Sequence, residues 1–433
     1  MLSTGNARTS GSLARRKFLG LAMAATMVGS LAACGSDDDK AETGAAGGGG
    51  KAIKFRITDA NLKPAMEELA AKFEKEKGIK VTVETTPWTD YWTKLTTEMT
   101  SGKAPDVIEM YASRYPSFED QLSDVTKAGV SMDDYNAADA LVKDGKNYGL
   151  PYSHNTNALL YNKDLLKAAG IKAEQFTWDP QTGGTLLAAA KKLTTGKTFG
   201  FPVWNNDQDL YLNMIAGNGH WVMDEKSEKF QYDKPENVAV LQFIMDLVNK
   251  HKVTPPPAQV ASSSAKVVDL FKAGQLALFP SNSGRLNDIA KATGFEWGIM
   301  PYPKGPGGDV TIVGNVYASV YKRSKNQDAA LEWVKYVSGA TGQQDLSKDR
   351  LLRPALKSAE AAWAESWKAK GVDVTAYTDP AFRQQPLPIT KGYVAAKQKI
   401  DAGFIEIFLG NLEVGEGAKQ ITEEAQKLRD AAR

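Results

Sequence analysis

Two hydrophobic periodicities alternate along the first folded stretch of the chain, and this alternation restricts the fold more than any other feature. Apolar residues recur at every second position over residues 53–57 and again over 79–83, as in strands. Between and after them, residues 62–73 and 92–99 carry apolar side chains at helical spacing, and residues 105–108 enter a third strand. Strands that alternate with helices predict an α/β fold with a mainly parallel sheet and helices on both faces.

In open sheets of this kind, ligands bind beyond the carboxyl ends of the strands. The turns at residues 58–61, 86–88 and 111–115 follow the three predicted strands. These turns are therefore the first places where we expect a binding site.

A second α/β region begins near Tyr152 and continues into a largely helical C-terminal part from about Ala355. Its predicted elements are helices around 186–193, 210–216 and 238–248, a strand at 276–279 and an amphipathic helix at 418–428. Residues 51–433 provide 383 residues, which is enough for two domains.

The first 33 residues have the pattern of an export signal. Arg15, Arg16 and Lys17 form a positive segment, and residues 18–33 are apolar or small, too short to span a membrane comfortably. Leu31-Ala32-Ala33 followed by Cys34 resembles a bacterial lipobox, which implies lipidation of Cys34 and an extracytoplasmic, membrane-anchored protein. The double arginine also resembles a twin-arginine motif, although Ala14 stands where that motif has Ser or Thr, so both export routes remain open.

Cys34 is the single cysteine of the chain, which excludes intramolecular disulfides and cysteine-based zinc clusters. After Cys34, residues 35–50 are then a tether, mostly of Gly, Ala, Ser, Thr and Asp with Lys40 and Glu42, too poor in apolar residues to fold. Four of the 53 Lys and Arg residues precede Cys34, so the remainder carries 49 cations against 51 anions, a net −2. Without a clustered basic excess, we expect no nucleic-acid partner.

Several segments, read in order, resemble the extracellular solute-binding proteins of ABC importers, specifically the maltose-binding-like family. The sharpest is Leu160-Tyr-Asn-Lys-Asp-Leu165, and the resembling segments extend over nearly the whole mature chain. The others are residues 73–81, 87–91, 101–107, 148–152, 169–171, 271–274, 303–308 and 353–355.

The resemblance implies two α/β lobes, each a mainly parallel sheet flanked by helices. The lobes are joined by hinge crossovers and close on a small polar solute, most simply a sugar. It places lobe one at 51–153 plus about 315–352, and lobe two at about 154–314 plus 353–433. It also implies a monomer without cofactor that delivers its ligand to separate permease subunits by lobe motion.

The chain departs from the family pattern at two places. Pro180-Gln-Thr-Gly-Gly184 is inserted after Thr177-Trp178-Asp179, and Gly284-Arg285 stands where many members have a Trp. The second departure removes a stacking residue that the family would otherwise supply.

Sugar sites combine planar hydrogen-bonding groups for hydroxyls with aromatic faces for the apolar side of the ring. In the first part of the chain, Tyr111 and Arg114 follow the third strand, and Trp88 lies in the loop before a helix. Asp59 and Asn61 follow the first strand, where either ligand contact or capping of the next helix is expected.

Further candidates lie at the predicted hinge. They are His154 and Asn155 on the first crossover, and Asn315 and Tyr317 on the second. A single histidine is more often structural than functional, so His154 has two competing interpretations.

The remaining candidates lie in the second region. One member of the polar run at 205–209 is expected to cap a helix, while Asp207 and Asp209 are expected to bind hydroxyls. Arg285 suits a pair of hydroxyls, a carboxylate or a phosphate, or else makes a surface ion pair. Tyr393 is a candidate from the helical C-terminal part.

We find no complete enzyme motif in the sequence. Gly196-Lys197-Thr198 resembles the end of a phosphate-binding loop, but Lys191 occupies the position of its first glycine. Three histidines cannot build a His-rich metal site, so we expect neither cofactor nor metal. A glycoside hydrolase would need two carboxylates across a cleft, for example Asp207 with Asp59 or Glu109.

The ligand class has alternatives as well. Arg114 and Arg285 would favour an anion such as a phosphorylated polyol, whereas clustered Asp residues with aromatics would favour a polyamine. Because these indications conflict, a neutral sugar is the main expectation.

Overall fold

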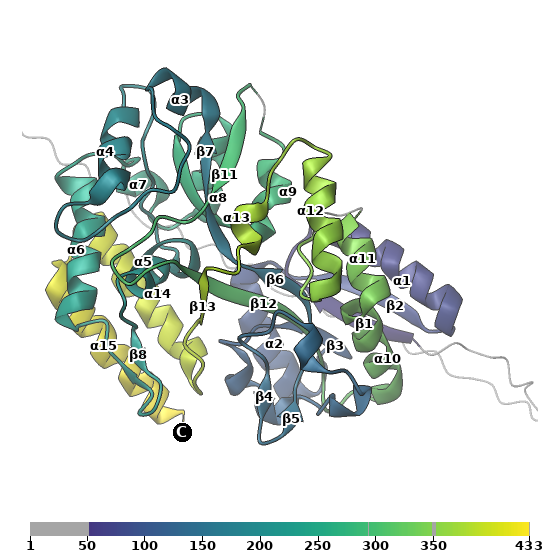
Figure 1. The fold of residues 1–433 in the computed structure, drawn as a ribbon. Helices are drawn as coiled ribbons and strands as arrows, with labels where there is room; N and C mark the ends of the chain where they lie inside the picture. The colour runs from purple at the N-terminus through teal and green to yellow at the C-terminus, as the bar shows by residue number, and fades with distance from the viewer. Residues whose placement is uncertain (1–51, 293, 349–351, 433) are drawn as a thin grey trace, which may run out of the picture. The chain divides into compact units, whose positions relative to one another are not determined.

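The computed structural model describes residues 52–292, 294–348 and 352–432, all within the unit Gly50–Arg433 (Figure 1). The predicted signal, Cys34 and the tether lie outside the described residues. Within the described part, no helix is long and apolar enough to cross a membrane.

The first sheet confirms the predicted strand–helix alternation. Strand β1 (Ala52–Ile57) pairs in parallel with β2 (Lys80–Thr85) and with β3 (Val107–Met110). The long strand β12 (Val310–Val320) adds antiparallel to β3, and it pairs with β6 (Leu150–Asn155) and β13 (Arg383–Pro386). The order is therefore β13-β12-β3-β1-β2, with β6 also on β12.

Helices cover this sheet at the positions that the periodicity predicts. Helix α1 (Lys63–Lys77) ends at Gly78, which adopts a left-handed conformation and donates its N–H to the Glu74 carbonyl. Helix α2 is Trp88–Ser101, and α10 (Gln327–Ser338) and α11 (Ala340–Lys348) lie beside α1 (Figure 1). Short connecting elements are η1 (Tyr115–Ser117), η2 (Glu119–Gln121), η3 (Thr126–Ala128), η4 (Met132–Asp134), β4 (Val142–Lys143) and β5 (Lys146–Asn147).

The second sheet differs from the expected parallel arrangement. Strand β7 (Asn157–Asn162) pairs antiparallel with β10 (Leu278–Asn282) and with β11 (Trp297–Met300). Asn282 lies opposite Asn157, so β10 returns toward the crossover from which β7 departs. Parallel contacts in this region are the isolated bridges Phe199–Leu276 and Thr177–Lys304.

Helices of the second region surround this sheet and include the amphipathic C-terminal helix. They are α3 (Lys163–Ala168), α4 (Gly184–Leu193), α5 (Leu212–Gly217), α6 (Pro235–Asn249), α7 (Pro257–Val260), α8 (Ser264–Lys272), η6 (Ser283–Arg285) and α9 (Leu286–Ile289). Beyond them follow η7 (Lys357–Ala359), α12 (Glu360–Lys368), α13 (Thr375–Thr378), α14 (Tyr393–Leu409) and α15 (Val414–Ala431). A hairpin of β8 (Met223–Asp224) and β9 (Lys229–Phe230) packs on α15, and α14 and α15 lie side by side (Figure 1).

Two large apolar cores correspond to the two sheets, and a smaller aromatic cluster adjoins the first. Phe55, Phe73 and Trp333 lie at the centre of the first core, where their rings meet edge to face. Strand β12 serves both cores, because Ile312 is buried in the second and Val316 in the first. The segment Leu150–Asn162 likewise passes from one core to the other through β6 and β7.

The inserted segment Pro180–Gly184 forms a turn that leads into α4. Asp179 Oδ1 accepts hydrogen bonds from the N–H groups of Gln181 and Thr182. Gly184 has φ +58°, and a Cβ atom there would lie 2.4 Å from the Thr177 carbonyl oxygen. The turn therefore requires glycine at position 184.

Candidate functional site

Aromatic rings gather where the first sheet ends, in the turns that the sequence predicts to bind ligand. Trp88 meets Tyr111 edge to face, with ring centroids 5.0 Å apart, and Trp92 at 5.3 Å. Trp88 is 43% exposed, whereas Trp92 is buried, as its helical spacing predicts. We call Trp88, Trp92 and Tyr111 the aromatic platform.

Arg114 lies over this platform and joins it to the second region. Its guanidinium carbon is 5.8 Å from the Trp88 ring centre, 5.5 Å from Trp92 and 5.8 Å from Tyr393 at the start of α14. Such distances are those of cation–π contacts. The structure therefore brings together four candidates from distant parts of the sequence: Trp88, Tyr111, Arg114 and Tyr393.

The polar run at 205–209 begins a short π-helical turn, η5 (Asp207–Tyr211). Asn206 caps it by accepting the N–H of Asp209, which confirms the expectation that one member of the run is a cap. Asp207 is half-buried, and its carboxylate lies 3.4 Å from the ammonium group of Lys397 on α14. Lys397 also forms an ion pair with Asp401 one helical turn further along.

Asp209 points away from solvent. It is fully buried and accepts hydrogen bonds from Asn282 (2.9 Å) and Asn206 (3.0 Å), and Arg285 Nε lies 3.3 Å from it. Burial raises the pKa of the Asp209 carboxyl, and Arg285 opposes this rise. The Arg285 side chain itself remains 29% exposed.

The crossover candidates form a buried polar network. His154 Nδ1 donates to Asn315 Oδ1, the Asn315 N–H donates to Asp139 (3.0 Å), and the Tyr317 hydroxyl donates to the same carboxylate (2.9 Å). All four side chains are buried. Burial and the nearby Arg353 lower the pKa of His154 to about 3, so the imidazole is neutral.

Three other candidates are accessible. Asn155 is half-buried and accepts a hydrogen bond from the Ser283 hydroxyl at 3.1 Å. Asp59 and Asn61 are exposed, and the Asn61 N–H donates to Asp59 Oδ1 at 2.8 Å. The expectation that Asp59 or Asn61 caps α1 is wrong: Leu62 occupies the cap position without any side-chain cap, because the Asp59 carboxylate is used in its own turn.

Sequence reasoning missed several polar residues that hold the candidates in place. Lys397, Asp139 and Asn282 are the clearest cases, since each contacts a candidate directly. Lys397 follows Tyr393 by four residues and therefore lies on the same helix face, a signal that was available in the sequence. Asp139 and Asn282 lie in segments without comparable periodicity.

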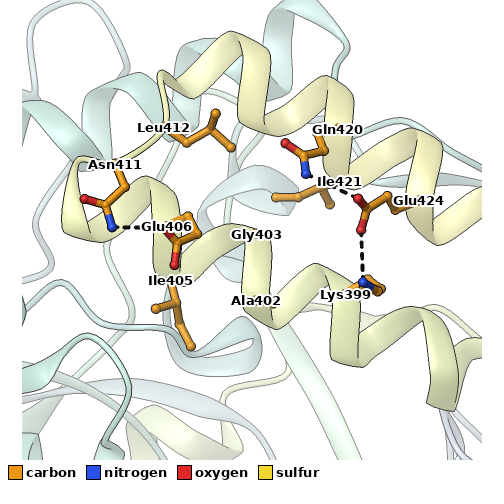
Figure 2. Close-up of a pocket in the computed structure, with 10 residues that line it drawn as sticks. All are labelled: Lys399, Ala402, Gly403, Ile405, Glu406, Asn411, Leu412, Gln420, Ile421 and Glu424. Atoms are coloured by element: carbon orange, nitrogen blue, oxygen red, sulfur yellow. Dashed lines mark hydrogen bonds and ion pairs between the residues drawn. The ribbon is translucent and has the colours of Figure 1, made fainter.

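A separate groove of about 500 Å³ lies between α14 and α15 (Figure 2). Figure 2 shows Lys399 paired with Glu424, and Asn411 donating to Glu406. None of the predicted site residues lines this groove. Within the described ranges, no group of three or more His, Cys, Asp or Glu residues could hold a metal ion.

Comparison with known proteins decides the family. The profile of the bacterial extracellular solute-binding protein family matches residues 68–375. The chain belongs to this family. Among solute-binding proteins, it is 27% identical over 385 residues to a maltooligosaccharide ABC transporter solute-binding lipoprotein of Streptococcus pneumoniae, which covers 86% of each chain. It is 26% identical over 420 residues to the diacetylchitobiose binding protein DasA of Streptomyces coelicolor, covering 89% of this chain and 94% of that protein.

Solved structures confirm the fold. An ABC substrate-binding protein from Listeria monocytogenes in complex with cycloalternan aligns with a TM-score of 0.78 at 24% identity, over 87% of this chain and 98% of that one. Maltose-bound MalE3 of T. maritima aligns with a TM-score of 0.74 at 21% identity, over 87% and 99% of the two chains. The solute-binding protein therefore has the two-lobed, maltose-binding-like fold that the resemblance implied.

Proposed function

We propose that this solute-binding protein captures a neutral sugar or oligosaccharide between its lobes and delivers it to the permease of an ABC importer. The observation that carries the proposal is the aromatic platform with Arg114 above it, at the carboxyl ends of β1, β2 and β3. An exposed indole suits the apolar face of a sugar ring, and the surrounding amides and carboxylates suit its hydroxyls. The names of the two relatives, which refer to maltooligosaccharide and diacetylchitobiose, support this ligand class.

The charges near the platform argue against a charged ligand. Asp207 is paired with Lys397, and Asp209 is paired with Arg285. A polyamine would need free carboxylates, and both carboxylates here are paired. A phosphorylated polyol would need free cations, whereas Arg114, the cation over the platform, lies against the rings of Trp88, Trp92 and Tyr393. The proposal therefore favours a neutral ligand over both alternatives.

Burial divides most of the candidates into two roles, and Arg114, which is 9% exposed, is assigned by its position over the platform. We propose that Trp88, Tyr111, Arg114, Asn155, Asp207 and Arg285 contact the ligand, with Asp59 and Asn61 at the rim. His154, Asp209, Asn315, Tyr317 and Tyr393 have fully or almost fully buried side chains, so we propose that they position other groups. The lobe boundaries near residues 154, 315 and 353 remain part of this proposal.

A glycoside hydrolase is the less favoured alternative. Asp207 is engaged by Lys397, and Glu109 is buried under hydroxyl donors, so neither carboxylate is free for acid–base work on a glycosidic bond. We propose binding without turnover, which chromatography of a bound oligosaccharide after long incubation would test. Released shorter sugars would contradict it.

We also propose that Cys34 carries the lipid anchor and that the protein acts as a monomer outside the membrane. The support is the lipobox-like sequence and the word lipoprotein in the name of the Streptococcus pneumoniae relative. Labelling with a palmitate analogue should be lost in Cys34→Ser, and labelling that persists would contradict the assignment.

A thermal-shift screen of Gly50–Arg433 tests the ligand class. The panel contains maltotriose, diacetylchitobiose and arabinotriose, with spermidine and glycerol phosphate as charged comparisons. A ligand at about 100 times its dissociation constant stabilises the folded state by about 2.7 kcal/mol. A saturable shift with one oligosaccharide supports the proposal, and a shift with a charged compound alone contradicts it.

A further inference from the structure

The carboxylate of Glu109 lies beneath the aromatic platform and is 2% exposed. It accepts hydrogen bonds from the Thr58 N–H (3.3 Å) and hydroxyl (2.5 Å), the Tyr111 hydroxyl (2.8 Å) and the Tyr152 hydroxyl (2.7 Å). No ion pair among the described residues involves it. Glu109 is therefore a buried acid held by neutral donors alone.

These donors come from three strands of the first sheet. Thr58 directly follows β1, Tyr111 directly follows β3, and Tyr152 lies in β6. In addition, the Tyr91 hydroxyl of α2 donates to the Glu109 carbonyl oxygen at 2.8 Å. Glu109 thus connects the strand ends with the helix that carries Trp88.

The hydrogen bond between Glu109 and Tyr111 determines which part of the Tyr111 side chain faces Trp88. Because the Tyr111 hydroxyl points inward to Glu109, the ring of Tyr111, and not its polar end, meets Trp88 at 5.0 Å and 89°. Trp88 meets the rings of Tyr111 and Trp92, and Arg114 lies over its ring. A substitution of Glu109 should therefore change the position of the exposed Trp88 indole through the ring of Tyr111.

We propose that Glu109 is the positioning residue of the aromatic platform, fixing the ends of β1 and β3 to β6 and turning the Tyr111 hydroxyl away from the ligand. Packing alone does not require an acid here, because an apolar side chain of similar volume avoids the desolvation of a buried carboxylate. The acid supplies enough acceptor positions to hold Thr58, Tyr111 and Tyr152 at once. The inference deepens the proposed sugar-binding function and rests on it.

Near-ultraviolet circular dichroism of Gly50–Arg433 tests the positioning without any ligand. The difference between the wild-type protein and Trp88→Phe isolates the Trp88 signal, and the same difference is then measured in Glu109→Gln and in Tyr111→Phe backgrounds. We expect both backgrounds to lose most of this signal. Glu76→Gln is the matched control, because it makes the same substitution at a glutamate that accepts from a tyrosine elsewhere, between α1 and α10, where Tyr336 donates to Glu76 at 3.1 Å.

Affinity for maltotriose, diacetylchitobiose and arabinotriose provides the second readout. For the sugar that binds, we expect Glu109→Gln and Tyr111→Phe each to weaken affinity about tenfold, and the double variant to weaken it little further, since both act on one bond. Unchanged Trp88 signal and affinity in Glu109→Gln, or losses that simply multiply in the double variant, would overturn the inference. If none of the sugars binds, the proposed function fails, while the dichroism comparison still decides the role of Glu109.

Discussion

Trp88 is the one member of the aromatic platform that keeps a large part of its ring open to solvent, at 43% exposure. We predict that Trp88→Ala weakens oligosaccharide binding by at least about tenfold, because an aromatic contact of this kind contributes roughly 0.5–1.5 kcal/mol beyond its buried area. The free energy of unfolding should change by less than about 1 kcal/mol, because the side chain is largely exposed. Calorimetric titration and urea unfolding measure the two quantities.

The control for this variant is Leu409→Ala, which truncates another exposed apolar side chain, 41% exposed at the end of α14. It should leave the affinity unchanged. Equal losses in the two variants would show that the platform has no special role.

His154 gives a pH dependence opposite in sign to that of Glu109, Asp139 and Asp209, the buried carboxyls whose pKa values are raised by burial. Its pKa falls from 6.5 to about 3 on folding, so between these values the unfolded chain binds one proton more than the folded protein. The stability gained by keeping His154 neutral is complete above about pH 6.5 and is lost as the pH falls toward 3. The free energy of unfolding should therefore drop by up to about 1.4 kcal/mol per pH unit in this window.

Urea unfolding between about pH 7 and pH 5 measures this slope. The variant His154→Asn should flatten it, whereas His251→Gln, at a site that is only half-buried, should retain most of it. A slope that is equally steep in His154→Asn would assign the effect to other groups.

For single residues, the sequence predicted which residue types lie near the site, but not whether each side chain is accessible or buried. Trp88, Tyr111 and Arg114 followed from strand ends, a rule that depends only on local periodicity. Buried Asn315 and Tyr317 donate to Asp139, and His154 donates to Asn315. Asp139 is 15 or more residues distant from each of the three in the sequence and carries no local signal. Polar type alone does not distinguish a ligand contact from a buried partner.

Helix α14 contributes the element-scale feature that the sequence analysis overlooked: a buried lysine that balances the acids near the platform. Lys397→Met would leave Asp207 and Asp401 without their shared cation. We predict a loss of about 1–3 kcal/mol in the free energy of unfolding, because Lys397 is 8% exposed. The same variant should acquire a thermal shift with spermidine, since two carboxylates are then free.

Lys399→Met is the matched control on the same helix. Its ion pair with Glu424 is solvent-exposed, so its removal should cost about 0.5 kcal/mol or less. If Lys397→Met neither loses stability nor gains spermidine binding, charge balance does not explain the preference for a neutral ligand.

The inserted turn before α4 gives a prediction about backbone geometry. Gly184→Ala combines a left-handed φ of +58° with a contact of 2.4 Å to the Thr177 carbonyl. We expect a loss of about 2–4 kcal/mol in urea unfolding. Gly170→Ala at φ +62°, with no atom within 4 Å, should show the left-handed strain alone, about 1 kcal/mol. Equal losses would mean that the close contact relaxes.

Elements with strong periodicity were predicted well, and those that depend on tertiary pairing were not. Helices α1, α2, α4, α6 and α15 were found because their apolar faces recur at 3.6 residues. The antiparallel second sheet and the π-helical start at Asp207–Tyr211 were missed, because neither strand direction nor a π-turn leaves a pattern in the hydrophobic spacing.

For the whole molecule, the two-lobed fold could be predicted only through the resemblance to a family. Pairings such as β12 with β13, or β6 with β12, join segments far apart in the sequence, and local periodicity does not specify them. The ordered set of short motifs did specify these pairings, because the members of the family share both the set and the fold. The ligand itself depends on side-chain orientation around the platform, which neither periodicity nor family membership determines.

The most direct test of the account is calorimetric titration of Gly50–Arg433 with the oligosaccharide that stabilises it best, at low and at high salt. We predict saturable binding with one site, with an affinity that does not change with ionic strength, because a neutral ligand has no charge for salt to screen. Binding that weakens steeply with salt, or saturable binding of spermidine or glycerol phosphate with none of an oligosaccharide, would contradict the proposed capture of a neutral sugar.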